Sequence, residues 1–203
     1  VHDDADAVLS TSDDGWTCGT PLAALTDDRN AMFAVAMNGK PLSPEHGFPV
    51  RMVVPGLYGY VSATKWVVDL EVTSFGDFSA FWTNRGWSEQ GPIKTQSRID
   101  VPRDRARRAE GEVAIGGIAW AQHTGINKVE VRVDDGDWVE ATLGTDASID
   151  AWCQWSLLWQ ASVGEHELAV RATDKAGYTQ TSDVADVLPN GATGWHTISV
   201  KVD

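Results

Sequence analysis

The sequence predicts a mainly β protein in two parts, of which the second is an immunoglobulin-like antiparallel β-sandwich. From about Pro102 onward, short runs of strand length recur at regular spacing with turn residues between them. Within these runs apolar and charged residues alternate, as in Lys128–Val133, and no helical periodicity competes. Before them, four prolines interrupt residues 38–56, which excludes one long helix there.

The expected strands of the sandwich share this length, spacing and alternation. They are Glu112–Trp120, Lys128–Val133, Trp138–Ala141, Trp152–Ala161, Gly164–Thr173, a weaker strand over Thr179–Asp186, and Trp195–Val202. Asp134-Asp135-Gly136-Asp137 is expected to be a hairpin turn, and residues 103–110 a charged turn that precedes the strands. We place the boundary between the two parts at residues 97/98, giving domains 1–97 and 98–203.

The first part is expected to combine short strands with one brief helix. Thr20 and Pro21 have the residue types of an N-cap followed by a first helical position, and the helix would run to about Leu25. The expected strands are Val8-Leu9, the apolar run Met32–Met37, the buried Val50–Val54, and the half-buried Lys65–Thr73, with Asn38-Gly39 as a hairpin turn.

Composition excludes several classes of function. A net charge of −13 argues against general binding to nucleic acid or to anionic membranes. The two cysteines, Cys18 and Cys153, form neither a disulfide framework nor a zinc motif. They are expected to be unrelated buried thiols, with one long-range disulfide as the alternative. The chain has ten tryptophans, many for its length, so several of them must lie in cores or at an interface.

The loop that carries His46 and Arg51 is the main candidate for chemistry. Prolines and glycines fix its backbone, and an imidazole and a guanidinium five positions apart suit a bound oxyanion or phosphate. The alternative is a surface loop with an incidental pair of charges, which the residues alone favour. The aromatic stretch Phe75–Trp87 is either the wall of a pocket or interdomain packing. No nucleophile elbow, phosphate loop or dinucleotide fingerprint is present.

The order of residues in this loop resembles the signature of the sulfite oxidase family of molybdopterin enzymes. The matching pattern is Asn38-Gly39-x-Pro41-Leu42…His46-Gly47-Phe48-Pro49-Val50-Arg51-x-Val53-Val54-Pro55-Gly56…Lys65-Trp66. Later segments resemble the dimerisation domain of that family. These are Gly116-x-x-Ala119-Trp120, Val129-Glu130-Val131, Asp135-Gly136-x-Trp138, Trp152–Gln160 and Gly194-Trp195-His196.

The resemblance implies an architecture and a set of roles. Residues before the sandwich would be the C-terminal part of a mixed α+β molybdopterin-binding domain, and the sandwich would form a homodimer. The cofactor would be molybdopterin, used for oxygen-atom transfer at molybdenum on a small-molecule substrate. The residues that would contact it are His46, Arg51, Ala63, Thr64, Lys65 and, as the counterpart of an upstream aspartate, Asp14.

Departures from the family pattern lead to further expectations. Neither cysteine stands in the arginine-rich motif that supplies the molybdenum ligand, so we expect the metal ligand in an earlier segment of a longer protein. This chain alone would then lack cofactor and be inactive. Trp87 occupies the position at which the animal enzymes of the family have an active-site tyrosine. Arg85, two residues earlier, is a second candidate catalytic residue. The turn Pro189-Asn190-Gly191 replaces a substrate-binding arginine, which weakens the case for sulfite.

Two wider expectations complete the prediction. The relatives that the pattern resembles suggest a bacterial enzyme that is extracytoplasmic, or attached to a membrane through segments outside this chain. The alternative function is a non-enzymatic immunoglobulin-like module that serves interaction or assembly.

Overall fold

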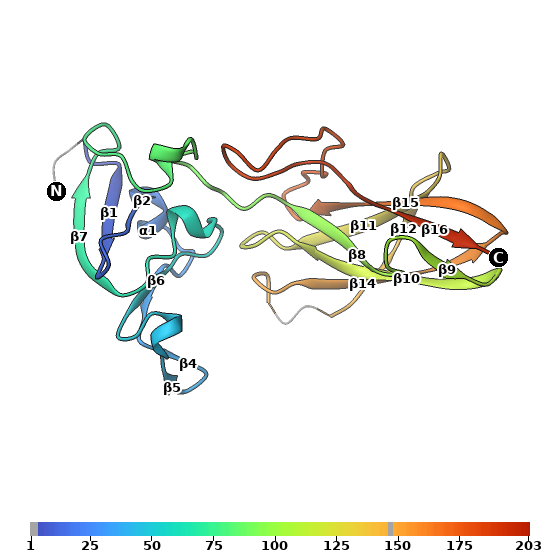
Figure 1. Ribbon diagram of the computed structural model, residues 1–203, viewed down its shortest axis with the longest axis horizontal. Helices are drawn as coiled ribbons and strands as arrows, with labels where there is room; N and C mark the ends of the chain where they lie inside the picture. The colour runs from blue at the N-terminus through green and yellow to red at the C-terminus, as the bar shows by residue number, and fades with distance from the viewer. Residues whose placement is uncertain (1–3, 146–147) are drawn as a thin grey trace. The chain divides into compact units, whose positions relative to one another are not determined.

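In the computed structural model, which describes residues 4–145 and 148–203, the chain folds into two units (Figure 1). Unit 1 comprises Val1–Ile93 and Val187–Gly191, and unit 2 comprises Lys94–Asp186 and Ala192–Asp203. The units thus divide between residues 93 and 94, where the sequence suggested 97/98. The return of Val187–Gly191 to unit 1 has no signal in the sequence, because it depends on contacts across more than a hundred residues.

Unit 1 is built on a three-stranded antiparallel sheet of order β2-β1-β7. Its strands are β1 (Ala7–Ser12), β2 (Thr17–Pro21) and β7 (Val67–Thr73), and the short helix α1 (Leu22–Thr26) follows β2. Two small pairs complete it: β3 (Met32–Ala34) with β6 (Arg51–Val53), and β4 (Ala36–Met37) with β5 (Lys40–Pro41). Three 3-10 turns, η1 (Pro44–His46), η2 (Gly59–Val61) and η3 (Thr83–Arg85), lie in the connections.

Two details of unit 1 correct the prediction. Thr20 does not cap the helix: it lies in β2, where its hydroxyl donates to the carbonyl of Val61 at 2.7 Å. The buried acceptor outcompetes the free N–H groups of a five-residue helix. The run Met32–Met37 is not one strand, because Val35 separates β3 from β4. The turn Asn38-Gly39 is confirmed, with positive φ at both residues, as a type I′ hairpin requires.

The strand β7 exists as predicted, but its apolar side chains are not buried. Val68 is 62% exposed, and Leu70 and Val72 are each 44% exposed. The strand pairs with β1 on one side, and among the described residues no strand pairs with its other side. Met32 and Phe33 are also about half exposed, at 49% and 50%. Unit 1 therefore leaves an apolar surface open to solvent.

Unit 2 is the immunoglobulin-like sandwich that the sequence predicts. One sheet has the order β13-β14-β10-β8, and the other β12-β11-β15-β16-β9. The strands are β8 (Gln96–Val101), β9 (Ala106–Arg108), β10 (Gly111–Trp120), β11 (Ile126–Val133), β12 (Val139–Glu140), β13 (Thr142–Leu143), β14 (Cys153–Ala161), β15 (Gly164–Asp174) and β16 (His196–Val202). Alternate residues of both sheets fill the core between them, including Ile115, Val129, Leu168 and Val200, all fully buried.

The sequence-based prediction of unit 2 is wrong for several of its short strands. Residues 179–186 form only isolated bridges, at Thr179 and Ala185, rather than a strand. Conversely β8, β9 and β13 were not predicted. Residues 106–108, expected in a turn, pair with β16 as the one parallel pair among the described strands. Their arginines protect a sheet edge, which charged residues commonly do.

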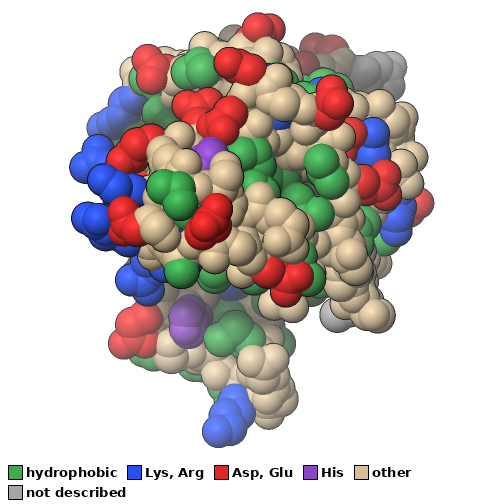
Figure 2. All heavy atoms as spheres, turned by 90° about the vertical axis from the view of Figure 1, so that its right-hand side faces the viewer, with side chains coloured by type: hydrophobic (Ala, Val, Ile, Leu, Met, Phe, Trp, Pro, Cys, Tyr) green, Lys and Arg blue, Asp and Glu red, His purple; other side chains and the backbone are tan. Residues whose placement is uncertain are grey.

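The charges on the surface and the burial of the two cysteines are as the composition leads one to expect. Viewed from the end of unit 2 where the C-terminus lies, basic side chains gather along one edge, and acidic side chains are spread over the rest (Figure 2). Cys18 and Cys153 are both buried and form no disulfide, as predicted. No helix in the described part of the chain is long and apolar enough to cross a membrane.

His166 links the turn after β11 to the start of β15. The His166 Nδ1 lies 2.8 Å from Asp134 Oδ2, and its Nε2 lies 2.8 Å from the carbonyl oxygen of Ser162. Both neighbours accept hydrogen bonds, so the doubly protonated ring satisfies them best. The Asp134 hydrogen bond is the main cause that raises the pKa of His166, and burial opposes it. For Asp134, burial raises the pKa, but hydrogen bonds from the backbone N–H of Glu167 and from His166 outweigh it. The pKa of Asp134 is therefore lowered.

This link predicts a pH dependence of stability. The pKa of His166 is raised in the folded state. The His166–Asp134 interaction therefore contributes fully to the free energy of unfolding below the unfolded-state pKa of about 6.5, and this contribution is lost as pH rises through the folded-state pKa. Chemical unfolding of wild type and His166→Gln should therefore differ by about 0.5–1 kcal/mol at roughly pH 5.5 and by less at roughly pH 8.5. A difference that stays constant between these pH values would contradict the link.

Candidate cofactor site

Three segments of unit 1 meet around Lys65 and Trp66. The Trp66 indole Nε1 donates to the carbonyl of Pro44 at 2.8 Å, and the Lys65 Nζ donates to that of Glu45 at 3.1 Å. The backbone N–H of Asp13 donates to the carbonyl of Trp66 at 2.9 Å. These bonds hold the η1 loop and the turn after β1 against the segment that leads into β7. Residues far apart in the sequence thus come together.

Gly47 allows the close approach of two cationic side chains. Its φ is +103°, in the left-handed region, and a Cβ placed there would lie 3.0 Å from the Cβ of Lys65 and 3.1 Å from that of Arg51. Only glycine both adopts this left-handed φ without strain and leaves room for the neighbouring side chains, because it has no Cβ. The loop therefore brings the side chains of Arg51 and Lys65 together beside Gly47, while His46 contacts Arg51 through its backbone carbonyl.

Arg51 has an unused donor. Its Nε is buried and has no hydrogen-bond partner among the described residues, while Nη1 makes a long contact of 3.4 Å to the carbonyl of His46. A buried guanidinium nitrogen without an acceptor is costly, since the donor has lost its bond to water. An anion with two oxygens would satisfy the guanidinium in the bidentate manner that phosphates favour.

A cavity of about 250 Å³ opens beside Lys65. It is lined by Ser12, Asp14, Trp16, Ala63, Lys65 and Trp66. The Asp14 carboxylate accepts from the Ser12 hydroxyl and from the N–H of Trp16, and these bonds, in that order, lower the pKa of Asp14. Asp14, Ala63 and Lys65, three of the residues predicted from the sequence, therefore share one cavity.

Thr64 is placed differently from its neighbours. Its side chain is fully buried, and its hydroxyl lies 2.7 Å from that of Ser10. Its carbonyl accepts from the N–H of Met52 at 2.8 Å. Hydroxyl and carbonyl thus hold the segment to the sheet and to β6, so only a backbone N–H contact to a ligand remains plausible for Thr64.

The two predicted catalytic residues lie in an aromatic cluster outside the cavity lining. Arg85 stacks over the ring of Phe81, with its Cζ 3.6 Å from the ring centroid, and donates to the carbonyl of the same residue at 2.6 Å. Trp87 packs against Tyr60, 4.6 Å between ring centroids, and against Trp82 at 5.8 Å. The cluster approaches the cavity through Phe81 and Trp16, 6.4 Å apart. Catalytic roles for Arg85 and Trp87 stay predictions.

Comparison with known families decides the relationship. Residues 1–82 match the family described as "Oxidoreductase molybdopterin binding domain", and residues 90–203 match "Mo-co oxidoreductase dimerisation domain". The second match covers more than half of the chain. The chain belongs to the sulfite oxidase family of molybdopterin oxidoreductases.

Individual members of the sulfite oxidase family match along most of the chain. Mitochondrial sulfite oxidase of Mus musculus is 33% identical over 90% of the chain, and sulfite oxidase of Arabidopsis thaliana is 30% identical over 88%. The chain spans 38% and 53% of these two proteins. The crystal structure of the sulfane dehydrogenase SoxCD from Paracoccus pantotrophus superposes with a TM-score of 0.77 and 26% identity. The superposition covers 99% of the present chain and 56% of the SoxCD chain.

The residues present fit the cofactor of this family. A phosphate-bearing pterin needs a guanidinium with a free donor, a cation beside it and a carboxylate for ring N–H groups. Lys65 and Asp14 supply the cation and the carboxylate in the cavity wall, and Arg51, which does not line this cavity, supplies the guanidinium on the other side of Gly47 from Lys65. Sequence reasoning missed Ser12 and Trp16, which complete the cavity wall. The turn residues Ser12–Gly15, followed directly by a tryptophan, were the signal that could have suggested them.

Proposed function

We propose that this chain acts in a molybdopterin-dependent oxidoreductase of the sulfite oxidase type, with unit 1 holding part of the cofactor and unit 2 forming a homodimer. The observation that carries the proposal is the buried Nε of Arg51, which lies beside Gly47 and Lys65 and has no hydrogen-bond partner in the described part of the chain. The family match and the sulfite oxidase relatives support the same activity class. No observation on the described residues favours the alternative of a non-enzymatic assembly module.

The residues of this chain would bind and orient rather than react. Arg51 would hold a phosphate oxygen pair, with the Lys65 ammonium as second cation, and Asp14 would accept from the pterin ring. The backbone of residues 63 and 64 would fix the same edge, and His46, exposed on the η1 loop, would donate from a ring nitrogen. When bound, the cofactor supplies two-electron oxygen-atom transfer at molybdenum.

The substrate is proposed as a small oxygen-transfer compound, with sulfite as one candidate. A tryptophan, Trp87, at a position that carries a phenol in the animal enzymes, and the turn Pro189-Asn190-Gly191, favour a substrate other than sulfite. The N–H of Ser88 donates to the carbonyl of Pro189 at 2.8 Å, which holds this turn near Trp87 within unit 1. Turnover by the holoenzyme with sulfite at a rate equal to its best substrate would contradict this preference.

Additional polypeptide is needed to complete the cofactor domain. The open apolar surface on β7 and β3 includes Val68, Leu70 and Phe33, and burying each such side chain stabilises by roughly 1.5–3 kcal/mol. The relatives are also longer than this chain. We infer that the missing polypeptide covers this surface and supplies the rest of the cradle.

The 203-residue chain by itself is therefore expected to retain no cofactor. The measurement is pterin fluorescence after acid release, together with molybdenum analysis, on protein purified from cells that make the cofactor. Circular dichroism would verify that the chain is folded. Stoichiometric pterin in the folded chain would overturn the proposed incompleteness.

A further inference from the structure

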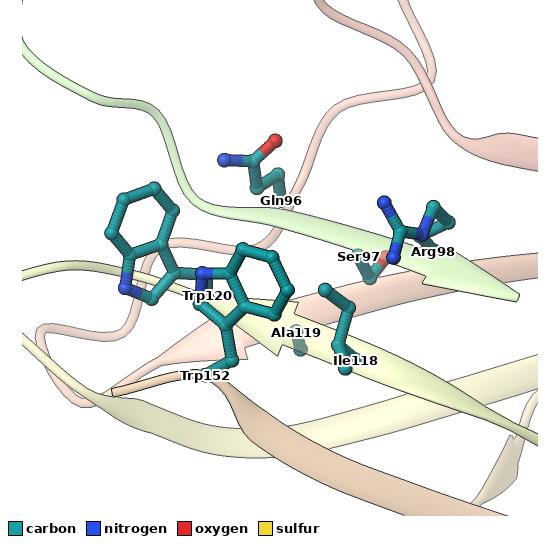
Figure 3. Close-up of a pocket in the computed structure, with 7 residues that line it drawn as sticks. All are labelled: Gln96, Ser97, Arg98, Ile118, Ala119, Trp120 and Trp152. Atoms are coloured by element: carbon teal, nitrogen blue, oxygen red, sulfur yellow. The ribbon is translucent and has the colours of Figure 1, made fainter. Parts of the chain in front are cut away.

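A histidine side chain, rather than a strand, contacts the free edge of β8 in unit 2. β8 is the last strand in the order β13-β14-β10-β8, and among the described residues no strand pairs with its other side. Figure 3 shows residues 96–98 of β8 beside residues 118–120 of β10, around a cavity of about 140 Å³. The next residue, Ile99, donates its backbone N–H to Nδ1 of His196 at 3.1 Å. Because His196 begins β16 of the five-stranded sheet, this bond joins the two sheets.

The donor in this contact fixes the protonation state of the His196 ring. A backbone N–H can only donate, so Nδ1 must accept, and the proton of the neutral imidazole lies on Nε2. Along β16, His196 has the same parity as Ile198 and Val200, which lie in the core, so its side chain points toward the opposite sheet. His196 is half-buried there. The bond to Ile99 therefore requires a neutral, inward-facing imidazole.

Three charged side chains act on the His196 ring: Arg98 and Asp100 of β8, and Asp104 of the turn that follows. Burial is the main cause that lowers the pKa of His196, and the Arg98 guanidinium lowers it further, whereas the two carboxylates oppose both. Asp100 pairs with Arg98 at 2.7 Å, and Asp104 accepts from a backbone N–H of β16 at 2.9 Å, so each carboxylate has a partner other than the ring. On the neighbouring strand β15, the residue opposite His196 is the apolar Val170.

A second contact holds β8 to the segment before β16, and it cannot titrate. The Ser97 hydroxyl donates to Oε1 of Gln180 at 2.7 Å, and Nε2 of Gln180 donates to the carbonyl of Gly194 at 2.8 Å. Ser97 and Gln180 are both buried. Neither a hydroxyl nor a carboxamide gains or loses a proton near neutral pH, so this bridge persists when His196 titrates. Loss of the bond to Ile99 would therefore loosen β8 locally rather than detach it.

We propose that the hydrogen bond from Ile99 to His196 is a pH-sensitive latch, closed at neutral pH and opened when acid protonates the ring. Protonation places a hydrogen on Nδ1, so two donors then face each other and neither is satisfied. The chain enters unit 2 after residues 93 and 191, and β8 follows the first entry while β16 follows the second. The latch thus joins the two strands through which the chain enters unit 2, and acid loosens this connection. Its dependence on pH is opposite to that of His166, whose contacts require the proton.

Hydrogen exchange at Ile99 in the full chain tests the latch. Because the bond needs the neutral ring, its contribution is complete above the unfolded-state pKa of about 6.5 and is lost as pH falls through the folded-state pKa. The protection factor of the Ile99 amide, measured by NMR from about pH 7.5 to about pH 4, should fall by about tenfold, the value of one lost hydrogen bond. Amides at the centre of β10 and β14 should keep their protection. A constant protection factor at Ile99 would overturn the latch, and an equal loss at all amides of unit 2 would indicate global unfolding and overturn a local device.

Substitutions of His196 test which group titrates. His196→Asn keeps an acceptor close to the place of Nδ1 but cannot be protonated in this range, so protection at Ile99 should stay high at every pH. His196→Ala removes the acceptor and should give low protection at every pH. His166→Gln is the matched control and should keep the acid-sensitive protection of wild type. Acid-sensitive protection in His196→Asn would assign the titration to Asp100 or Asp104 and overturn the role of His196. If His196→Ala does not fold, the profiles of wild type and His196→Asn still decide.

Discussion

Replacing Gly117 by alanine is expected to remove about 3 kcal/mol or more from the stability of unit 2. A Cβ at Gly117 would lie 1.9 Å from the carbonyl oxygen of Arg98 and 2.9 Å from Cζ2 of Trp155. The strand cannot shift to relieve this, since β10 is bonded to β14 on one side and to β8 on the other, with a register irregularity at this residue. Such a loss is a large fraction of the roughly 5–15 kcal/mol that stabilises a typical domain.

Urea unfolding followed by tryptophan fluorescence would measure the effect. Gly116→Ala is the matched control: its Cβ would point outward and lie 3.2 Å from the carbonyl oxygen of Trp155, a contact that needs an adjustment of only a few tenths of an ångström. It should cost less than about 1 kcal/mol. Equal midpoints for the two variants would show that the close approach at Gly117 has been misjudged.

Removal of the Arg51 guanidinium is expected to cause a large loss of cofactor affinity. In a holoenzyme that contains this segment, Arg51→Ala should lower cofactor affinity by about tenfold to a hundredfold, the value of a charge-assisted hydrogen bond to a phosphate. Folding should be little affected, because the Nε makes no hydrogen bond among the described residues and Nη1 makes only one long contact. Pterin and molybdenum content per chain, measured after dialysis, would report the loss.

Arg51→Lys is the informative control for this prediction. It keeps the positive charge but not the planar pair of donors, so it should recover only part of the lost affinity. A variant Arg51→Ala with the pterin content of wild type would refute the role of this side chain. If both variants lost the cofactor together with thermal stability, a purely structural role would be indicated instead.

The sequence predicted those elements whose signals are local. Alternation in β10, β11, β14 and β15 shows directly which residues lie in the core, because side chains of a strand point to opposite faces. The turn Asn38-Gly39 fixed a hairpin by its own backbone preferences. The three-residue β9 and the two-residue β13 gave no such pattern, since runs this short hold no period. They became strands only through their partners.

The sequence by itself therefore determined the family and the sandwich. The ordered loop from Asn38 to Trp66 and the alternation after residue 102 are properties of neighbouring residues. Only the tertiary structure decided that Asp14 joins Ala63 and Lys65 in one cavity and that the Nε of Arg51 finds no acceptor among the described residues. It also decided that β7 keeps its apolar side open. Each of these depends on what distant segments cover, and periodicity along one strand carries no information about that.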